Sequence, residues 1–297
     1  MEINITYSSE LVSNYMQSET VSPANKFEAL QSPDGHSLLF SIGTDNAFYL
    51  TEEMPRIVTG WQQNNLSASL SSNFPSGSVI VAKTFATAQN YTNNNFTIAL
   101  VLSVNNSDFL YVASSYSRSP NNYISLNWEP MTFDAVNKSG TGLNISAISI
   151  LQTANSPLII VDTVPNDKQT LERYYIDSNK LVSETYWNLY TLPVNMDAAS
   201  ANVCGGRKSE EWVDGVYSVG QVANIDSIFY QQVFNPFDKS MAGETSQLFL
   251  PNVGKPQAIA STPSAVIKST STITYTDLFV STAEGSLYYF AANNQRN

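Results

Sequence analysis

The residues of this chain best suited to chemistry are three cations in loops or in an apolar segment. Lys83 interrupts the apolar stretch 79–85, Arg207 follows two glycines, and Lys255 lies between a glycine and a proline. A cation withdrawn from water needs a partner, and a developing oxyanion or phenolate in a protein pocket is such a partner. We therefore take Lys83, Arg207 and Lys255 as the candidate catalytic residues.

A second group of side chains suits the binding of a ligand. Polar turn residues offer amide and carboxylate groups, whereas an indole and a phenol offer flat surfaces for stacking. We choose these residues because they lie in or near predicted loops; no flanking motif identifies them. The candidate ligand-binding residues are Asp45, Asn106, Trp212, Tyr217 and Gln257.

The sequence gives little support to metal, cofactor or nucleophile chemistry. His36 is the only histidine and Cys204 the only cysteine, which argues against a histidine-based zinc site, a thiolate cluster and a Ser-His-Asp triad. No phosphate-binding or dinucleotide-binding glycine motif is present, so we expect neither metal nor cofactor. The carboxylate pair of a glycosidase would have to come from Asp45, Asp162, Asp226 and Glu284, in contexts that also favour simple turns.

Charge and composition restrict the partners and the location. The formal net charge of −11 repels nucleic acid, and the apolar runs are too short to span a bilayer. Seven Asn-x-Ser/Thr sequons, all in the first half of the chain, suit N-glycans and a secreted protein whose leader has been removed. A cytoplasmic location is the alternative, and a homo-oligomer is compatible with the sequence. The sequons begin at Asn4, Asn65, Asn90, Asn95, Asn105, Asn137 and Asn144.

One pattern occurs five times and predicts the fold. A strand-like segment carries a tyrosine directly after another bulky residue, and the pairs recur at intervals of 55 to 64 residues. Each pair follows an apolar strand and a short polar turn. A fixed period of about 60 residues with about four strands per unit is typical of a β-propeller. The pairs are Phe48-Tyr49, Leu110-Tyr111, Tyr174-Tyr175, Phe229-Tyr230 and Tyr288-Tyr289.

These repeats predict one all-β domain, a five-bladed β-propeller over residues 1–297. The blades would span approximately residues 10–70, 71–140, 141–196, 197–254 and 255–297. The last unit is short of a strand, and residues 3–7 alternate like one, so we expect residues 1–9 to complete it and close the ring. A six-bladed ring is the runner-up, with a degenerate blade in residues 62–77 or 236–256. Fourth strands are the least regular, and we place one at Tyr123–Trp128.

The predicted strand order assigns the candidate residues to the two rims of the channel. Loops between second and third strands hold Asp45, Asn106 and Glu284 at one mouth of the channel. We place Lys255 and Gln257 on the other rim. A single small molecule on the axis would then meet residues from several blades.

The repeated unit resembles the fungal propeller lectins of the fucose-binding and tectonin types. Segments 41–49 and 171–177, with a Thr-Asp-x-x-Phe-Tyr or Leu-x-x-Tyr-Tyr pattern, carry the resemblance best. In such lectins an Arg, a Glu and an aromatic residue recur between blades, which implies several sugar sites. This chain has only five arginines, and they do not recur at one blade position.

Retention of the blade repeat without a repeated site favours one site on the central axis. In this the chain is similar to secreted-type fungal propellers of tropolone–sesquiterpenoid pathways. Those proteins promote dehydration to a quinone methide and its hetero-Diels–Alder capture. This resemblance implies a cofactor-free cyclase that binds an aromatic or terpenoid molecule and works by orientation and hydrogen bonding. Our main hypothesis is such a central-pocket binder, and the alternative is a carbohydrate-binding lectin.

Overall fold

The structure is a computed structural model, and its described residues cover most of the predicted strands. These are residues 27–32, 34–53, 60–89, 95–118, 124–131, 144–152, 157–163, 172–177, 188–191, 197–205, 213–222, 225–234, 242–248, 254–268 and 271–293. The predicted closing strand in residues 1–9 lies outside them. The number of blades and the domain boundaries therefore stay predictions.

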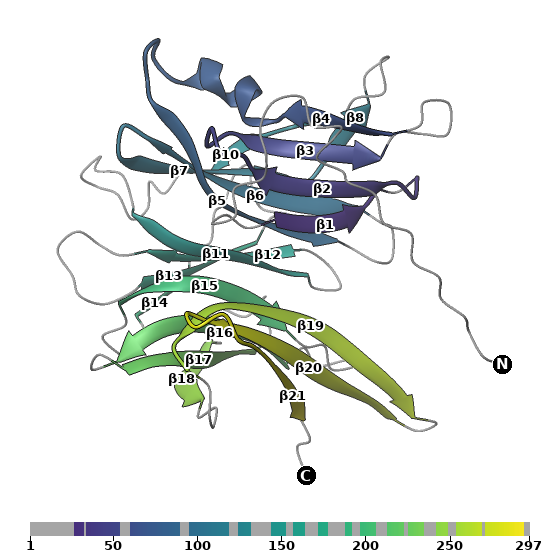
Figure 1. The fold of residues 1–297 in the computed structure, drawn as a ribbon, viewed down its shortest axis with the longest axis vertical. Helices are drawn as coiled ribbons and strands as arrows, with labels where there is room; N and C mark the ends of the chain where they lie inside the picture. The colour runs from purple at the N-terminus through teal and green to yellow at the C-terminus, as the bar shows by residue number, and fades with distance from the viewer. Residues whose placement is uncertain are drawn as a thin grey trace.

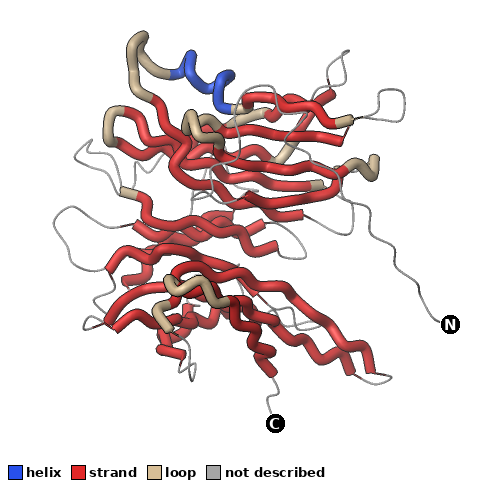
Figure 2. The backbone as a smooth tube through the Cα atoms, in the orientation of Figure 1, coloured by secondary structure: helices blue, strands red, loops and turns tan. Residues whose placement is uncertain are grey.

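Strands make up nearly all of the described chain, with the 3-10 helix η2 (Ser67–Asn73) among them (Figure 2). The strands form antiparallel sheets whose members follow one another in the sequence. We number the sheets one to five in chain order. Sheet one contains β1 (Phe27–Gln31), β2 (Ser37–Ile42), β3 (Phe48–Glu53) and β4 (Trp61–Asn65). Sheet two contains β5 (Ile80–Gln89), β6 (Phe96–Val104), β7 (Ser107–Ala113) and β10 (Glu129–Met131).

The second half of the chain repeats this arrangement. Sheet three contains β11 (Ile145–Gln152), β12 (Pro157–Thr163), β13 (Glu172–Asp177) and β14 (Asn188–Thr191). Sheet four contains β15 (Asp197–Gly205), β16 (Val213–Val222), β17 (Ile225–Phe234) and β18 (Ala242–Leu248). Sheet five has three described strands, β19 (Pro256–Lys268), β20 (Ser271–Thr282) and β21 (Leu287–Asn293).

The first strand of each sheet faces the first strand of the next. β1, β5, β11, β15 and β19 neighbour one another in that order, and Figure 1 shows the five sheets following one another through the molecule. This agrees with the prediction that each unit begins at an inner strand. The ends of these strands and the turns around them are therefore the places where neighbouring sheets can share a site.

Alternating side chains explain why the sheets pack on both faces. In β3, Phe48 and Leu50 are buried and face the core between sheets one and two. Successive residues of a strand point to opposite faces, so adjacent residues can pack toward different neighbours. Leu110 and Tyr111 of β7 belong to different core clusters for this reason.

One prediction about the outer strands is wrong. The strand expected at Tyr123–Trp128 is the short strand β9 (Ile124–Leu126), which pairs with β8 (Tyr116–Arg118) in a separate ribbon. β10 takes the fourth position of sheet two. Residues 62–77 hold the end of β4 and the 3-10 helix η2 (Ser67–Asn73), so they do not form the degenerate blade of the six-bladed alternative.

The ribbon β8–β9 fills the space between sheets one and two. Ile124 and Leu126 are buried in the same cluster as the apolar residues of sheet one. The Tyr116 ring stacks on Phe96 with centroids 5.1 Å apart, and Asn64 of β4 donates its amide to the Ile124 carbonyl at 3.2 Å. An insertion from sheet two thus buries apolar surface against its neighbour, and it brings Arg118 to the edge of sheet one.

Candidate functional site

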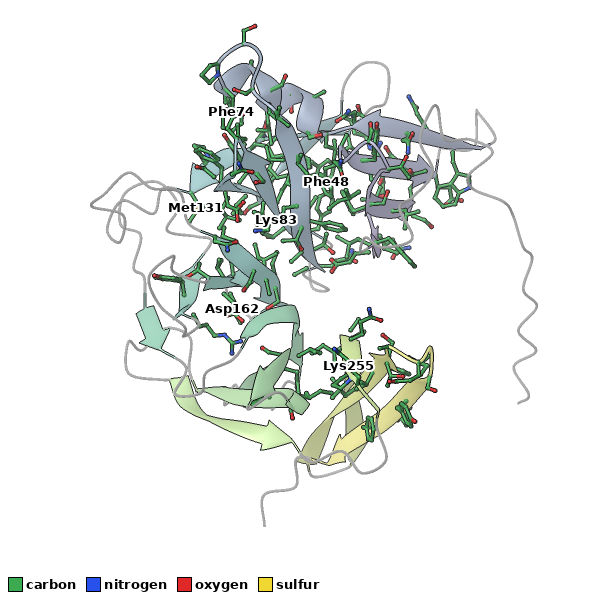
Figure 3. The ribbon with its side chains drawn as sticks, turned by 60° about the vertical axis from the view of Figure 1, so that its left-hand side comes forward. Phe48, Phe74, Lys83, Met131, Asp162 and Lys255 are labelled. Atoms are coloured by element: carbon green, nitrogen blue, oxygen red, sulfur yellow. The ribbon has the colours of Figure 1, made fainter. Side chains whose placement is uncertain are left out.

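The candidate cation Lys83 lies at a β-bulge of β5, where the pairing with β6 shifts register between Ala82 and Thr84. Its Nζ donates to Asp108 Oδ2 at 2.7 Å and to Asn144 Oδ1 at 2.9 Å. The same Asp108 oxygen accepts the backbone N–H of Ile145, at the start of β11. Figure 3 shows Lys83 close to sheet three. The side chain therefore joins sheets two and three through a carboxylate that is itself buried.

The candidate turn residues have structural partners. Asp45 accepts the hydroxyl of Tyr49 at 2.5 Å and the backbone N–H of Ala47 at 3.1 Å, within the β2–β3 turn. Asn106 lies exposed in the β6–β7 hairpin with φ 68°. Both residues are thus at turns, as expected, and Asp45 stabilises its own turn.

The structure places Lys255 on the rim opposite to the one we expected. The backbone N–H of Ala283, in the β20–β21 turn, donates to the Lys255 carbonyl at 2.9 Å. Lys255 therefore shares a rim with Glu284. Hydrogen bonds from its own backbone and from the Thr282 hydroxyl hold the pKa of Glu284 below its ordinary value, with a smaller contribution from Lys255. The reason for the error is topological, because in an antiparallel sheet the start of the first strand and the turn between the second and third strands lie at the same end.

Two further candidates lie in sheets four and five. Tyr217 is buried in the core cluster of sheets four and five, whereas Gln257 is exposed at the start of β19. Arg207 and Trp212 lie outside the described residues. Their roles stay predictions.

A different constellation of charges lies between sheets one and two, centred on Arg118 of the ribbon. Its Nη1 lies 2.7 Å from Glu52 Oε1, and its Nη2 lies 3.0 Å from Asp34 Oδ2 and 3.2 Å from Asp34 Oδ1. Glu52 belongs to β3 and Asp34 to the β1–β2 turn. One guanidinium therefore bridges two carboxylates from different parts of sheet one.

The two carboxylates of this site differ in their surroundings. The Glu52 side chain is only 6% exposed, whereas that of Asp34 is 45% exposed. Burial raises the pKa of Glu52, although Arg118 acts in the opposite direction. Burial also acts to raise the pKa of Asp34, but hydrogen bonds from Ser32 and Arg118 outweigh it, so that this pKa is lowered.

The buried carboxylate of Glu52 has Arg118 as its charge partner. Its Oε1 lies 2.7 Å from Arg118 Nη1 and is shielded from solvent. A buried charge without such a partner is costly. Glu52 therefore holds the guanidinium in place.

Polar and aromatic groups surround this site. Tyr116 shares β8 with Arg118, and burial raises the pKa of its phenol, with the carboxylate charges of Asp34 and Glu52 adding to the effect. His36 lies close enough for its charge to act on Glu52. Together with Asp34, Glu52 and Arg118 they form what we call the Arg118 site.

Sequence reasoning counted Arg118 among five arginines that do not recur, and passed over Glu52. The position of Glu52 in its strand could have identified it. Glu52 shares the face of β3 with Phe48 and Leu50, so alternation puts a carboxylate at a core position. Such a residue requires a partner, but the sequence does not say that a ribbon from the next unit provides it.

A second buried arginine has a structural role. Arg173 Nε and Nη2 donate to the two oxygens of Asp162 at 2.6 Å and 2.8 Å, and Nη2 also donates to Ser218 Oγ at 2.7 Å. Arg173 and Asp162 are almost fully buried, and Figure 3 shows Asp162 inside sheet three. This bidentate pair joins sheets three and four and occupies the carboxylate of Asp162, which makes it a poor glycosidase candidate.

The described residues contain neither a metal-binding cluster nor a membrane-spanning helix. In the described ranges, no three His, Cys, Asp or Glu residues are grouped so that they could hold a metal ion. Among the same residues, no helix has the length and apolar character needed to cross a membrane.

Comparison with known proteins identifies the fold. No protein-family model and no curated protein matches the sequence. Among solved structures, a mutant of AofleA from Arthrobotrys oligospora matches with a TM-score of 0.55 and 10% identity, over 92% of this chain and 70% of that one. The α-L-arabinanase of Penicillium chrysogenum, complexed with arabinobiose, matches with a TM-score of 0.51 and 12% identity, over 94% and 82%. A thermostable family-43 glycoside hydrolase matches with 0.50 and 13%, over 93% and 95%.

These likenesses bear on the fold alone, because the identities are low. The chain is an all-β protein of the propeller class, and the prediction of this fold class is confirmed. The resemblance to Diels–Alderase-type propellers gains no support from them.

Proposed function

We propose that the protein binds carbohydrate at one site per chain, the Arg118 site between sheets one and two. The observation that carries the proposal is a guanidinium held between a buried and an exposed carboxylate beside a tyrosine. Sugar hydroxyls both donate and accept hydrogen bonds, so a site with fixed donors and fixed acceptors suits them. This is the alternative of the sequence analysis, with the several lectin sites reduced to one.

The proposal also explains why the two carboxylates of the site differ in exposure. Glu52 is withdrawn from water and holds the guanidinium of Arg118, while Asp34 faces the solvent and accepts hydrogen bonds from Ser32 and Arg118. A ligand would approach from the exposed side and reach Arg118 at its partly exposed guanidinium. Bonds to charged groups are stronger than neutral ones, so a small site of this kind suffices for one sugar residue.

The geometry favours binding over hydrolysis. A glycosidase needs an acid and a second carboxylate on the two sides of the scissile bond, with a sugar between them. In the Arg118 site the guanidinium occupies the position between Glu52 and Asp34. The arabinanase and the family-43 hydrolase support the idea that this fold carries sugar sites, and this support is by analogy of fold.

The cyclase hypothesis and the secreted location have weaker support. Lys83, one of its three cations, is engaged by Asp108 and Asn144, and no described contact favours a central apolar pocket. An extracellular location would suit a glycan-binding protein and agrees with the sequons. Both stay predictions.

The test is a glycan array followed by titration calorimetry with any sugar that binds. We expect one site per chain, and Arg118→Ala to weaken binding about ten- to a hundredfold, since a hydrogen bond to a charged group contributes roughly 1.5–3 kcal/mol. Arg118→Lys keeps the positive charge beside Glu52 but loses the planar fork, so it should fold normally and still bind weakly. Lys255→Ala removes an exposed cation from the other rim and serves as the matched control.

Several outcomes would contradict the proposal. They are binding at several equivalent sites, unchanged affinity in a folded Arg118→Lys protein, equal loss in Lys255→Ala, and an array without any bound glycan. Circular dichroism of each variant separates loss of the site from loss of the fold.

A further inference from the structure

The β6–β7 hairpin presents a sequon at its tip. Asn105 and Asn106 form the two-residue turn with φ 49° and 68°, the left-handed pair that this type of hairpin requires and that Asn tolerates well. Ser107 opens β7 directly after it. The turn therefore displays the sequence Asn105-Asn106-Ser107 at an end of sheet two, clear of the strands.

The side chain of Asn105 is oriented by its oxygen and leaves its nitrogen available. Its Oδ1 accepts the backbone N–H of Val79 at 3.2 Å, and its own backbone N–H donates to the Val79 carbonyl at 3.2 Å. Within the described residues, the Nδ2 group of Asn105 makes no hydrogen bond, and the residue is exposed. An N-glycan is attached through Nδ2, so the bond from Val79 to Oδ1 would persist in the modified protein.

Asn105 differs from two other described sequon asparagines. Asn65 is half-buried, and its Oδ1 accepts Ser67 Oγ at 2.9 Å and the Ala68 N–H at 3.0 Å, which holds the start of η2. The sequon serine Ser67 is itself buried and accepts the Phe48 N–H. A glycan on Asn65 would crowd a packed helix end, whereas one on Asn105 would extend into solvent.

Asn144 is another sequon asparagine of the described residues. It is exposed, but its Oδ1 accepts the ammonium of Lys83 in the junction of sheets two and three. The next residue, Ile145, is fully buried. A glycan there would start at a packed junction, so Asn144 is the internal comparison for any experiment.

A second observation concerns the surface beside Asn105. Val79, which makes both hydrogen bonds to Asn105, is 66% exposed. An isolated exposed apolar side chain is ordinary, but this one is fixed against the carrier of a sequon. The first sugar of a glycan on Asn105 would cover it with its C–H groups and remove apolar surface from water.

From these observations we infer that Asn105 is an N-glycosylation site of this protein. In the transfer, Nδ2 forms a bond to the anomeric carbon of an oligosaccharide carried on a lipid pyrophosphate. The bond from that carbon to the pyrophosphate oxygen breaks, the lipid pyrophosphate leaves with the electron pair, and the amide gives one proton to a base. The inference does not rest on the proposed sugar-binding site, which lies at the other ends of the strands.

The experiment expresses the full chain behind a secretion leader in yeast and treats it with an amidase that removes N-glycans. That treatment converts a glycosylated asparagine to aspartate, which peptide mass spectrometry detects in secreted and cell-retained protein alike. We expect the peptide with Asn105 to be converted in most molecules. Ser107→Ala should abolish the conversion and raise the electrophoretic mobility by one glycan, while Ser107→Thr keeps the sequon and should leave it unchanged.

Ser107→Ala retains Asn105 and the turn, so it should fold like the parent protein. An Asn105 peptide that stays unconverted overturns the inference, whether the glycan sits on Asn144, on Asn65 or nowhere. Equal mobility of Ser107→Ala and the parent protein overturns it as well.

Discussion

At the scale of single residues, this protein places charge where its strands are otherwise apolar, and among the described residues three buried carboxylates pair with a cation from another segment. Glu52 meets Arg118, Asp108 meets Lys83, and Asp162 meets Arg173. Removal of one member of a buried pair leaves an uncompensated charge and typically costs about 3–5 kcal/mol. Charged residues are few in this chain, and several of the described ones join neighbouring sheets.

Glu52 gives a prediction at this scale. Because its pKa in the folded protein lies above the ordinary value of 4.5, the folded state binds more protons than the unfolded state just above pH 4.5. The contribution of Glu52 to stability therefore falls as the pH rises through that window. Glu52→Gln cannot ionise, so the stability of the parent relative to this variant should be lower at pH 7 than at pH 4.5.

Urea unfolding of the two proteins at both pH values measures this difference. Asp34 has a lowered pKa, so its contribution is lost only at more acidic pH, below 3.8. Asp34→Asn is the control, because it should alter the difference little between pH 4.5 and 7. A parent protein that gains stability over Glu52→Gln as the pH rises would show that Arg118, and not burial, controls this carboxylate.

At the scale of elements, the turn between β2 and β3 makes hydrogen bonds within its own sheet and to the neighbouring sheet. Asn46 in the β2–β3 turn has φ 61°, and its carbonyl accepts the Ala82 N–H of the next sheet at 2.8 Å. The bond between Tyr49 and Asp45 closes the same turn. One local motif thus positions both its own sheet and the inner strand of its neighbour.

Gly43 gives a prediction for this turn. A Cβ at Gly43 would lie 2.6 Å from Asp45 Oδ1 and 2.7 Å from Tyr49 Cε2. Gly43→Ala should therefore lower the free energy of unfolding by about 1–3 kcal/mol, as overpacking usually does. The measurement is urea unfolding, and Asn46→Gly is the control, because glycine adopts the positive φ of that position without strain. Equal stability of Gly43→Ala and the parent would mean that Tyr49 can move aside at little cost.

At the scale of the whole molecule, the last sheet of the series has three described strands. Leu287 and Tyr289 of β21 are largely exposed, whereas Tyr49 and Tyr111, the tyrosines that correspond to Tyr289 in sheets one and two, are buried. Our prediction is that residues 1–9 complete this last unit. The predicted strand lies outside the described residues, so its place stays a prediction.

A matched pair of substitutions tests this prediction. In the alternating segment 3–7, Ile5 would face the core and Thr6 the solvent or a neighbouring surface. Ile5→Asp should lower the free energy of unfolding by about 2–3 kcal/mol because it removes a buried apolar side chain, while Thr6→Asp should change it little. Urea unfolding compares the two, and equal effects would argue against a strand at this position.

Local patterns in the sequence were enough to predict the class of fold and most of the strands. Local signals were enough, because the tyrosine pairs, the polar turns and the alternation of apolar residues each act over a few neighbouring positions. They placed the five tyrosine pairs in strands, which are β3, β7, β13, β17 and β21, and they failed at the outer edge of sheet two, where the ribbon β8–β9 replaced the expected strand. The ribbon packs on another sheet, so its own sequence carries no sign of that partner.

The location of the candidate site depends on how the sheets pack and could not be predicted from the sequence. Arg118 and Asp34 are 84 residues apart in the sequence, and no local pattern relates them. They meet because the ribbon of sheet two buries its apolar side chains against sheet one, and because the β1–β2 turn ends at the same rim. Such a contact depends on how whole sheets pack, whereas the strands themselves depend on side chains that are neighbours along the chain.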